Sequence, residues 1–272
     1  MQYIFAIIAG IIQGATEFIP VSSSGHLILF HNIFNFNLPD DMFFDVMVHL
    51  GTFVALALVF WRDLEKIIRG FVSSLFNWNL RNNANQRLAW LVIIGMLPAG
   101  IAGFALDKFI ENNLRSSLVV AIALIAVAIL FLIAEKIAKK METINELKPA
   151  NALLIGVAQV LALIPGVSRS GITIIAGLWK NLKREEAARY SFLLSLPVIF
   201  GAGMKKLLDL TNWADAQWGI IIIGFLAAAI SGYLAVKFLM RYLTKHSLKV
   251  FAVYRIVLGL IVIGWIIFFG GK

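Results

Sequence analysis

Two short runs of hydroxyl-bearing residues and glycine interrupt an otherwise apolar chain. Residues 22–25 read Ser-Ser-Ser-Gly and are followed by His26, and residues 168–171 read Ser-Arg-Ser-Gly and are followed by Thr173. A hydroxyl beside a titratable side chain can act as a nucleophile with its base. Hydroxyls, glycine amides and a guanidinium together bind an oxyanion. The two runs therefore predict a site for an anionic group, with acid–base or nucleophilic chemistry close to it.

Gln13 and Glu17 precede the first run. Their spacing places both side chains on one face of a helix, and a polar face in an apolar segment must look into a cavity. Gln13 has a simpler alternative, an amide hydrogen bond between helices. For Glu17 we favour a functional role. His26 titrates near neutral pH and could act as base, acid or nucleophile at the same site.

Arg169 is the most informative single residue. A guanidinium in the middle of an apolar segment costs about 2.5–3.5 kcal/mol, so it needs a partner. A structural salt bridge with Glu17 is one explanation, and a bound oxyanion is the other. The hydroxyls and glycines outnumber what one carboxylate needs, which favours the oxyanion. The residues predicted to bind phosphate are Ser22, Ser24, Gly25, Ser168, Ser170, Gly171 and Thr173.

Composition identifies lipid as the solvent of this chain. Of its 272 residues 60% are hydrophobic and 14% charged, and the mean hydropathy is +0.87, all outside the range of soluble globular proteins. Apolar stretches such as 118–134 and 220–236 are about as long as the ~20 residues of a spanning helix. The sequence lacks the alternation of apolar and polar residues that strands would show. We predict a polytopic all-α membrane protein that forms one domain, residues 1–272.

The charges fit a membrane surface better than nucleic acid. The net charge is +9, but Lys and Arg lie in short connections between apolar runs rather than on one helix face. The absence of cysteine excludes disulfides, a thiol nucleophile and a thiolate metal site. The first residues lack a basic start and include Gln13 and Glu17, so we expect no cleaved signal peptide.

The two halves of the sequence resemble each other at an offset of about 146 residues. Gly-Ile-Ile-Gln at 10–13 matches Gly-Val-Ala-Gln at 156–159. Pro-Val-Ser-Ser-Ser-Gly at 20–25 matches Pro-Gly-Val-Ser-Arg-Ser-Gly at 165–171. Gly95 and Gly103 match Gly224 and Gly232 in the same way. The pairing of residues 117–136 with 249–268 matches one mainly apolar stretch with another and is weaker.

We therefore predict two repeats, at about 1–145 and 146–272, each with one broken segment followed by three uninterrupted spans. The spans are expected at 42–60, 88–106, 117–136, 190–204, 218–236 and 250–269. The Asn-rich stretch 61–87 reads as a solvated connector with an interfacial part. The helices after the two runs are expected to begin near Leu27 and Ile172.

If each broken segment enters and leaves on one side, each repeat crosses three times and the second repeat is inverted. Most of the 24 Lys and Arg residues then fall in four cytoplasmic connections, as the positive-inside rule requires. These connections are 61–87, 136–148, 180–189 and 237–249. Both termini and the first break would face outside. If both broken segments crossed fully, the repeats would be parallel and the charge split poor.

Several polar residues receive a plainer interpretation. Leu196 in the second repeat stands where His49 stands in the first, so we expect His49, with His31 and Asp45, to serve packing or the interface. Arg255 lies in the final span, where it could pair or snorkel, and is assigned no role.

On its two motifs the sequence resembles the undecaprenyl-diphosphate phosphatase family of bacterial membranes, also called the bacitracin-resistance (BacA or UppP) family. The motifs are residues 13–26, Gln-Gly-Ala-Thr-Glu-Phe-Ile-Pro-Val-Ser-Ser-Ser-Gly-His, and residues 165–173, Pro-Gly-Val-Ser-Arg-Ser-Gly-Ile-Thr. The resemblance spans nearly the whole chain. It implies hydrolysis of undecaprenyl diphosphate to undecaprenyl phosphate and phosphate, which recycles the lipid carrier of peptidoglycan synthesis.

The resemblance also implies catalytic roles for Glu17, Ser23, His26 and Arg169, and a site in the bacterial inner membrane that is open to the periplasmic side. A divalent cation, Mg²⁺ or Ca²⁺, is expected to bridge Glu17 and Gln13 to the substrate phosphate, because one carboxylate and one amide cannot enclose it. The expected partners are the lipid diphosphate and membrane lipid, and nucleic acid is not expected to bind. A homodimer is one oligomeric state that the chain could adopt.

The sequence leaves two choices open. Either Ser23 attacks phosphorus with His26 as base, or His26 itself attacks or activates water. The rival function is a polyprenyl-phosphate flippase or transporter, because inverted repeats with broken helices are a transporter architecture. Glu17 would then be a proton site and no phosphate would be released. A scaffolding protein would leave Arg169 unexplained.

Overall fold

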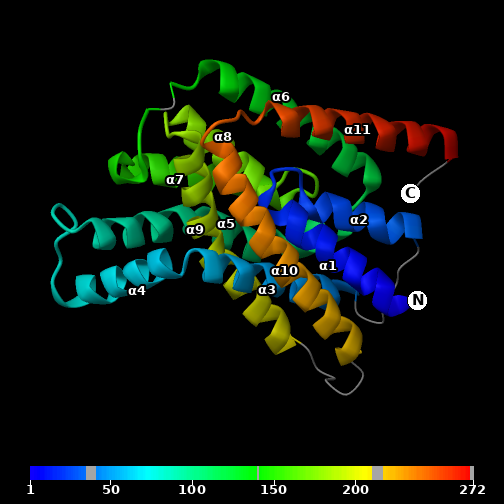
Figure 1. Ribbon diagram of the computed structural model, residues 1–272, viewed down its shortest axis with the longest axis horizontal. Coiled ribbons are helices and arrows are strands. Elements are labelled where there is room, and N and C mark those ends of the chain that lie inside the picture. Colours follow the sequence, from blue (N-terminus) through cyan, green and yellow to red (C-terminus); the bar gives the residue numbers. More distant parts are fainter. Residues whose placement is uncertain (35–40, 140, 210–216, 270–272) are drawn as a thin grey trace.

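The computed structural model describes residues 1–34, 41–139, 141–209 and 217–269, and every regular element in these ranges is helical (Figure 1). The first half contains α1 (Gln2–Phe18), α2 (Ser23–Phe34), α3 (Asp41–Val59), α4 (Trp61–Phe76), α5 (Ala84–Asn113) and α6 (Ser117–Ile137). The second half contains α7 (Pro149–Val160), α8 (Arg169–Trp179), α9 (Arg184–Asp209), α10 (Trp218–Leu243) and α11 (Lys249–Phe269). Two short 3₁₀ turns, η1 (Ile144–Glu146) and η2 (Leu161–Leu163), complete the described part.

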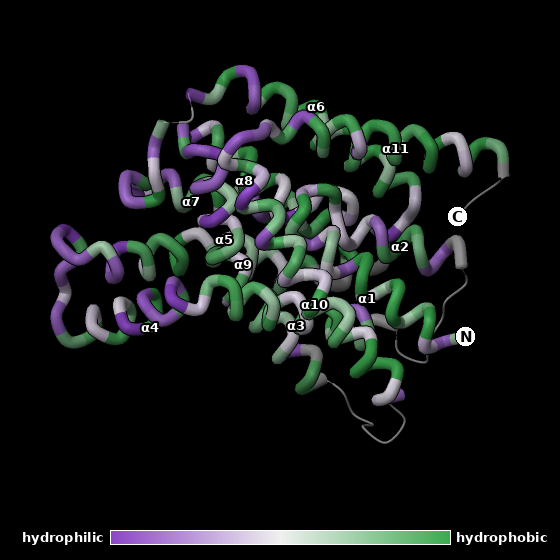
Figure 2. The backbone as a smooth tube through the Cα atoms, viewed as in Figure 1, coloured by the Kyte–Doolittle hydropathy of each residue, from purple (hydrophilic) through white to green (hydrophobic). Residues whose placement is uncertain are grey.

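Five helices in the described part of the chain are long and apolar enough to cross a membrane. They cover Ala84–Leu106, Ser117–Ile137, Arg184–Lys205, Trp218–Leu243 and Lys249–Phe268. A sixth candidate consists of α3 and α4 together, which meet at an angle of 86°. Figure 2 shows apolar residues along α6, α10 and α11, and hydrophilic residues gathered at the α4–α5 turn. The protein is therefore an all-α multi-pass membrane protein, as its composition predicts.

The segment 61–87 differs from the prediction of a solvated connector. Most of it is helix α4, which packs along the start of α5 (Figure 1). The helical spacing of Leu64 and Ile67, which both pack against the core, was the overlooked signal. Gly70 brings α4 so close to the backbone of Asn85 that no Cβ would fit there. The asparagines are concentrated in the turn that follows, where Asn83 caps α5.

Helices of opposite halves cross at glycines. Gly10 of α1 faces Gly224 of α10, and Gly156 of α7 faces Gly95 of α5, both too closely for a Cβ. Gly10 and Gly156 are matched positions of the internal repeat, and so are Gly224 and Gly95. The same helix crossing thus occurs twice with the halves exchanged, so that each half lays its broken segment against the other half.

We expect Gly156→Ala to lower the free energy of unfolding by about 1–3 kcal/mol, because the added methyl group overpacks the crossing with Gly95. Gly100→Ala on α5 is the matched control, since nothing lies within 4 Å of a Cβ at that position and alanine is the better helix former. Thermal unfolding in detergent measures both. Equal midpoints for the two variants would contradict the prediction.

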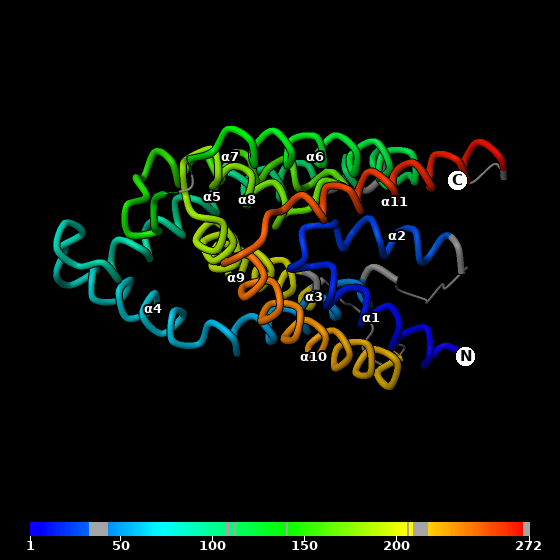
Figure 3. Tube along the Cα trace, turned by 45° about the horizontal axis from the view of Figure 1, so that its top comes forward, coloured from blue at the N-terminus to red at the C-terminus, as the bar shows by residue number. Residues whose placement is uncertain are grey.

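The start of α1 and the end of α11 lie at the same end of the molecule (Figure 1). The α4–α5 turn and the connection from α6 toward η1 lie toward the opposite end (Figures 1 and 3). The basic residues predict this arrangement when they are assigned to the cytoplasmic side. The repeat boundary near residue 145 and the inverted orientation of the two repeats stay predictions.

Candidate active site

Both helix breaks are built in the same way. Ser22 and Ser168, at matched repeat positions, have φ angles of 77° and 72°, a region that residues with a Cβ seldom adopt. Gly25 donates its backbone N–H to Ser22 Oγ at 3.3 Å, and Gly171 donates its own to Ser168 Oγ at 3.1 Å. Each serine therefore caps the helix that follows it.

Because of the capping serines, both helices begin several residues earlier in the sequence than predicted. α2 begins at Ser23 and α8 at Arg169, earlier than the predicted starts near Leu27 and Ile172. The residues of the two runs therefore lie in the first turns of α2 and α8. The unpaired backbone N–H groups and the positive end of the helix dipole favour an anion at such a position.

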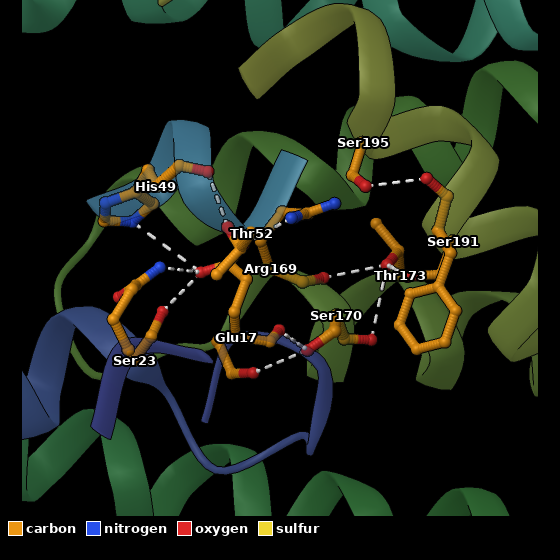
Figure 4. A network of polar contacts seen from close by, with 12 residues as sticks. Glu17, Ser23, His49, Thr52, Arg169, Ser170, Thr173, Ser191 and Ser195 are labelled. Carbon is orange, nitrogen blue, oxygen red and sulfur yellow. Dashed lines mark hydrogen bonds and ion pairs between the residues drawn. The ribbon is translucent and has the colours of Figure 1, made fainter. Parts of the chain in front are cut away.

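The carboxylate of Glu17 is where the two breaks meet (Figure 4). Ser23 Oγ donates to Glu17 Oε2 at 2.6 Å, and Gln13 Nε2 donates to the same oxygen at 2.9 Å. Arg169 reaches across from the second break, and its Nη2 forms an ion pair with Glu17 Oε1. Ser170 Oγ donates to the backbone oxygen of Glu17 at 3.0 Å. One buried side chain, 7% exposed, thus joins both motifs.

The ion pair does not use all the polar atoms of this group. Arg169 Nη1 and Gln13 Oε1 are buried and have no hydrogen-bond partner among the described residues. An unsatisfied buried polar atom costs about 1–3 kcal/mol, so such atoms mark a place for a ligand. A bound anion would accept from Arg169. Both explanations that the sequence offers for Arg169 are therefore compatible: it pairs with Glu17 and keeps a donor for an oxyanion.

His26 points elsewhere. Its Nδ1 lies 2.7 Å from the carbonyl oxygen of Ser22 and must donate to it, which leaves Nε2 to accept from the hydroxyl of Tyr254, also 2.7 Å away. The ring stacks on that of Tyr254 with 5.8 Å between the centroids. Within the described ranges, neither of its ring nitrogens contacts Glu17 or Ser23. The structure therefore does not place His26 as a base beside Ser23.

His49 lies beside Glu17, a position that the sequence analysis did not predict for it. Its Nε2 lies 3.6 Å from Glu17 Oε2, and its Nδ1 lies 2.7 Å from the backbone oxygen of Asp45. The comparison of the repeats misled us, because it set His49 against Leu196. An imidazole inside an apolar span is itself a functional signal and could have found it. His31 and Asp45 lie 3.3 Å apart and link α2 to α3.

Thr173 links the turn that carries Arg169 to the neighbouring helix α9. Its Oγ1 donates to the backbone oxygen of Arg169 at 2.8 Å and lies 2.6 Å from Ser191 Oγ on α9 (Figure 4). Thr173 therefore fixes the turn that carries Arg169 against α9. The remaining predicted ligand, Ser24, lies in the first turn of α2, with its Oγ 3.4 Å from Ser22 Oγ.

The described residues contain no group of three or more His, Cys, Asp or Glu side chains that could hold a metal ion. Glu17 and Gln13 nevertheless offer oxygen atoms, and the unpaired Gln13 Oε1 fits a hard cation that takes its other ligands from phosphate and water.

Known proteins match nearly the whole of this chain. The family model described as bacitracin resistance protein BacA matches residues 6–261. Three similar proteins, each named undecaprenyl-diphosphatase, come from Rubrobacter xylanophilus, Halothermothrix orenii and Alcanivorax borkumensis. The first is 43% identical over 267 residues, covering 96% of this chain and 97% of the relative. The second is 42% identical over 265 residues (97% and 98%), and the third is 42% identical over 268 residues (98% and 100%). This chain belongs to the bacitracin resistance protein BacA family.

Proposed function

We propose that this protein is an undecaprenyl-diphosphate phosphatase, which hydrolyses the lipid diphosphate to undecaprenyl phosphate and inorganic phosphate. Relatives that match almost the whole chain carry the name of this activity. The observation that carries the proposal is that Ser23 and Arg169 both contact the buried carboxylate of Glu17, while Arg169 keeps one unpaired donor. These three side chains could serve as a nucleophile, its base and a guanidinium that binds phosphate.

Ser23 is the nucleophile in this proposal, and Glu17 is its base. The hydroxyl of Ser23 already donates to Glu17 Oε2 at 2.6 Å, so the carboxylate can take its proton as Oγ attacks the terminal phosphorus. The Oγ–P bond forms, the bridging P–O bond breaks, and the proton passes from Glu17 to the departing undecaprenyl phosphate. Water then attacks the phosphoserine. Glu17 takes a proton from this water and returns it to Ser23 Oγ as inorganic phosphate leaves.

Arg169 and the starts of α2 and α8 stabilise the charge on the phosphorus that is transferred. Nη1 of Arg169 donates to a phosphate oxygen while Nη2 stays paired with Glu17. One guanidinium therefore contacts both the base and the phosphate. Gln13 and Glu17 would hold Mg²⁺ or Ca²⁺, which would neutralise further phosphate charge when bound. His26 fixes the first break through Ser22 and Tyr254.

We expect Ser23→Ala to lower the turnover number at least about a hundredfold, because no other hydroxyl donates to Glu17 Oε2 in the described part of the chain. Ser116→Ala is the matched control, since Ser116 lies outside the site and its Oγ accepts from the backbone N–H of Val119 at the start of α6. The rate of phosphate release measures both variants. Near-full turnover of Ser23→Ala would exclude the serine nucleophile and leave activated water.

The protein is further proposed to lie in the bacterial inner membrane with its site open to the periplasmic side. The basic connections and the shared position of the start of α1 and the end of α11 support this orientation. A homodimer stays a prediction.

Release of inorganic phosphate from undecaprenyl diphosphate tests the function directly. The purified protein in detergent is assayed with Mg²⁺, with Ca²⁺ and with a chelator, and we expect release that depends on the divalent ion. If well-folded protein binds the lipid phosphate but releases nothing, the flippase becomes the better function. In that case Glu17 would serve as the proton site of transport.

A further inference from the structure

Arg255 lies in the second turn of α11, and the proposed reaction does not use it. Its side chain has no exposed surface, although the helix around it is apolar. No carboxylate among the described residues lies within ion-pair distance of it. A buried guanidinium at membrane depth is costly and needs a reason.

Backbone carbonyl groups are its partners instead. Nη1 donates to the oxygen of Pro20 at 3.2 Å, in the first break. Nη2 donates to the oxygens of Gly166 and Val167 at 2.8 and 3.1 Å, in the second break. Nε donates to Leu124 on α6 at 3.2 Å. One guanidinium therefore joins both breaks to each other and to α6.

The breaks create the need for this side chain. Where a helix is interrupted inside a membrane, its carbonyl groups lose their helical donors, and lipid cannot replace them. The fixed fork of arginine presents donors in several directions at once, which a lysine ammonium cannot do over the same span. Gly166, at φ 94°, packs on the backbone of Val120 so closely that no Cβ would fit, so the second break is pressed against α6 at the same place.

The internal repeat makes the arrangement more specific. Residues 117–136 and 249–268 are its matched pair, and in this pairing Arg255 stands opposite Ala123. Arg255 Nη2 lies 3.4 Å from the oxygen of Ala123 itself. The small side chain of one copy leaves room for the large one of the other. A single guanidinium at the junction of the halves thus serves two breaks that the repeat makes equivalent.

We infer that Arg255 is a positioning residue that sets the distance between the two breaks, so that Ser23 of the first and Arg169 of the second converge on Glu17. Tyr254, the preceding residue, bonds His26 and so holds the first break at a second point. The effect on turnover rests on the proposed phosphatase function. The effect on the distance between the breaks does not.

The distance is the first measurement. The chain has no cysteine, so Ile11→Cys on α1 and Leu161→Cys in η2 allow two spin labels to be attached at sites that are each 49% exposed and lie outside the site. Pulsed electron paramagnetic resonance then gives the distribution of the distance between them. With Arg255 present we expect one narrow distribution. In Arg255→Gln we expect a broadened or shifted one. Lys249→Gln, which removes a charge from the start of the same helix, is the control and should leave it unchanged.

Turnover is the second measurement. We expect Arg255→Gln to lower kcat about a hundredfold with KM nearly unchanged, because a displacement of about 1 Å between catalytic groups can have this effect. Arg255→Lys should recover part of the turnover and part of the narrow distribution together. If Arg255→Gln does not fold, Arg255→Lys takes its place, with broadening and reduced kcat still expected.

An unchanged distance distribution in the variant that folds would overturn the inference. Loss of turnover without a change in distance would also overturn it, because Arg255 would then act through its charge. A broadened distribution in a protein that never releases phosphate, even with Arg255 present, would support the positioning role and remove the phosphatase function.

Discussion

Glu17→Gln should lower kcat for phosphate release by about 10²–10⁴-fold, the range that a positioned general base contributes. The amide keeps the shape of the carboxylate but cannot take the proton of Ser23, which donates to Glu17 Oε2 at 2.6 Å. It also leaves the guanidinium of Arg169 without its anion. We therefore expect KM to fall or stay constant while kcat collapses, because the freed guanidinium can bind phosphate more fully.

Glu65→Gln makes the same chemical change at an exposed ion pair with Arg69 on α4 and should keep full activity. Both variants are compared by initial rates of phosphate release over a range of lipid concentrations, after size-exclusion chromatography has shown that they are folded. A Glu17→Gln enzyme with the native kcat would remove Glu17 as the base. A rise in KM at constant kcat would assign Glu17 to binding alone.

Arg169→Lys should have the second large effect, a fall in kcat of about 10²–10³-fold, comparable with the loss of one transition-state donor. The ammonium group can still pair with Glu17. It cannot at the same time place a second, rigidly oriented donor where Arg169 Nη1 lies unpaired. We also expect KM to rise, since the donor for phosphate is lost in the ground state as well.

Arg189→Lys is the matched control, because Arg189 pairs with Asp63 at 2.6 Å outside the site. The same rate measurements apply. If Arg169→Lys keeps native kcat and KM, the guanidinium serves only the salt bridge with Glu17, and the simpler explanation for its presence is sufficient.

The residues that the sequence located well are polar groups that stand out in apolar surroundings. Glu17, Ser23 and Arg169 occur within a few residues of the prolines that open the two breaks, Pro20 and Pro165, and the structure brings all three together. The two breaks and the all-α membrane class follow from the same contrast between polar and apolar segments. Local sequence was sufficient here because the signal was local.

Other features depend on partners far apart in the chain. Tyr254 bonds His26 across 228 positions, and nothing near either residue announces the other. Arg255 bonds backbone carbonyls, which every residue has, so no side-chain motif marks its partners. His49 lies on a regular helix without a break. These residues could be placed only once the packing of the helices was known.

The exchanged glycine crossings have a consequence for the biogenesis of the protein. α1 packs mainly against α10, and α7 packs against α5. Although α2 and α3 also contact α1, its main partner is missing until α10 has left the ribosome. Until then α1 and the polar turn after it must wait in the translocation machinery or at the bilayer surface, because lipid cannot solvate their free carbonyl groups. The enzyme can therefore become active only after α10 and α11 have been inserted, and a chain truncated before them would keep its first motif without ever assembling a site.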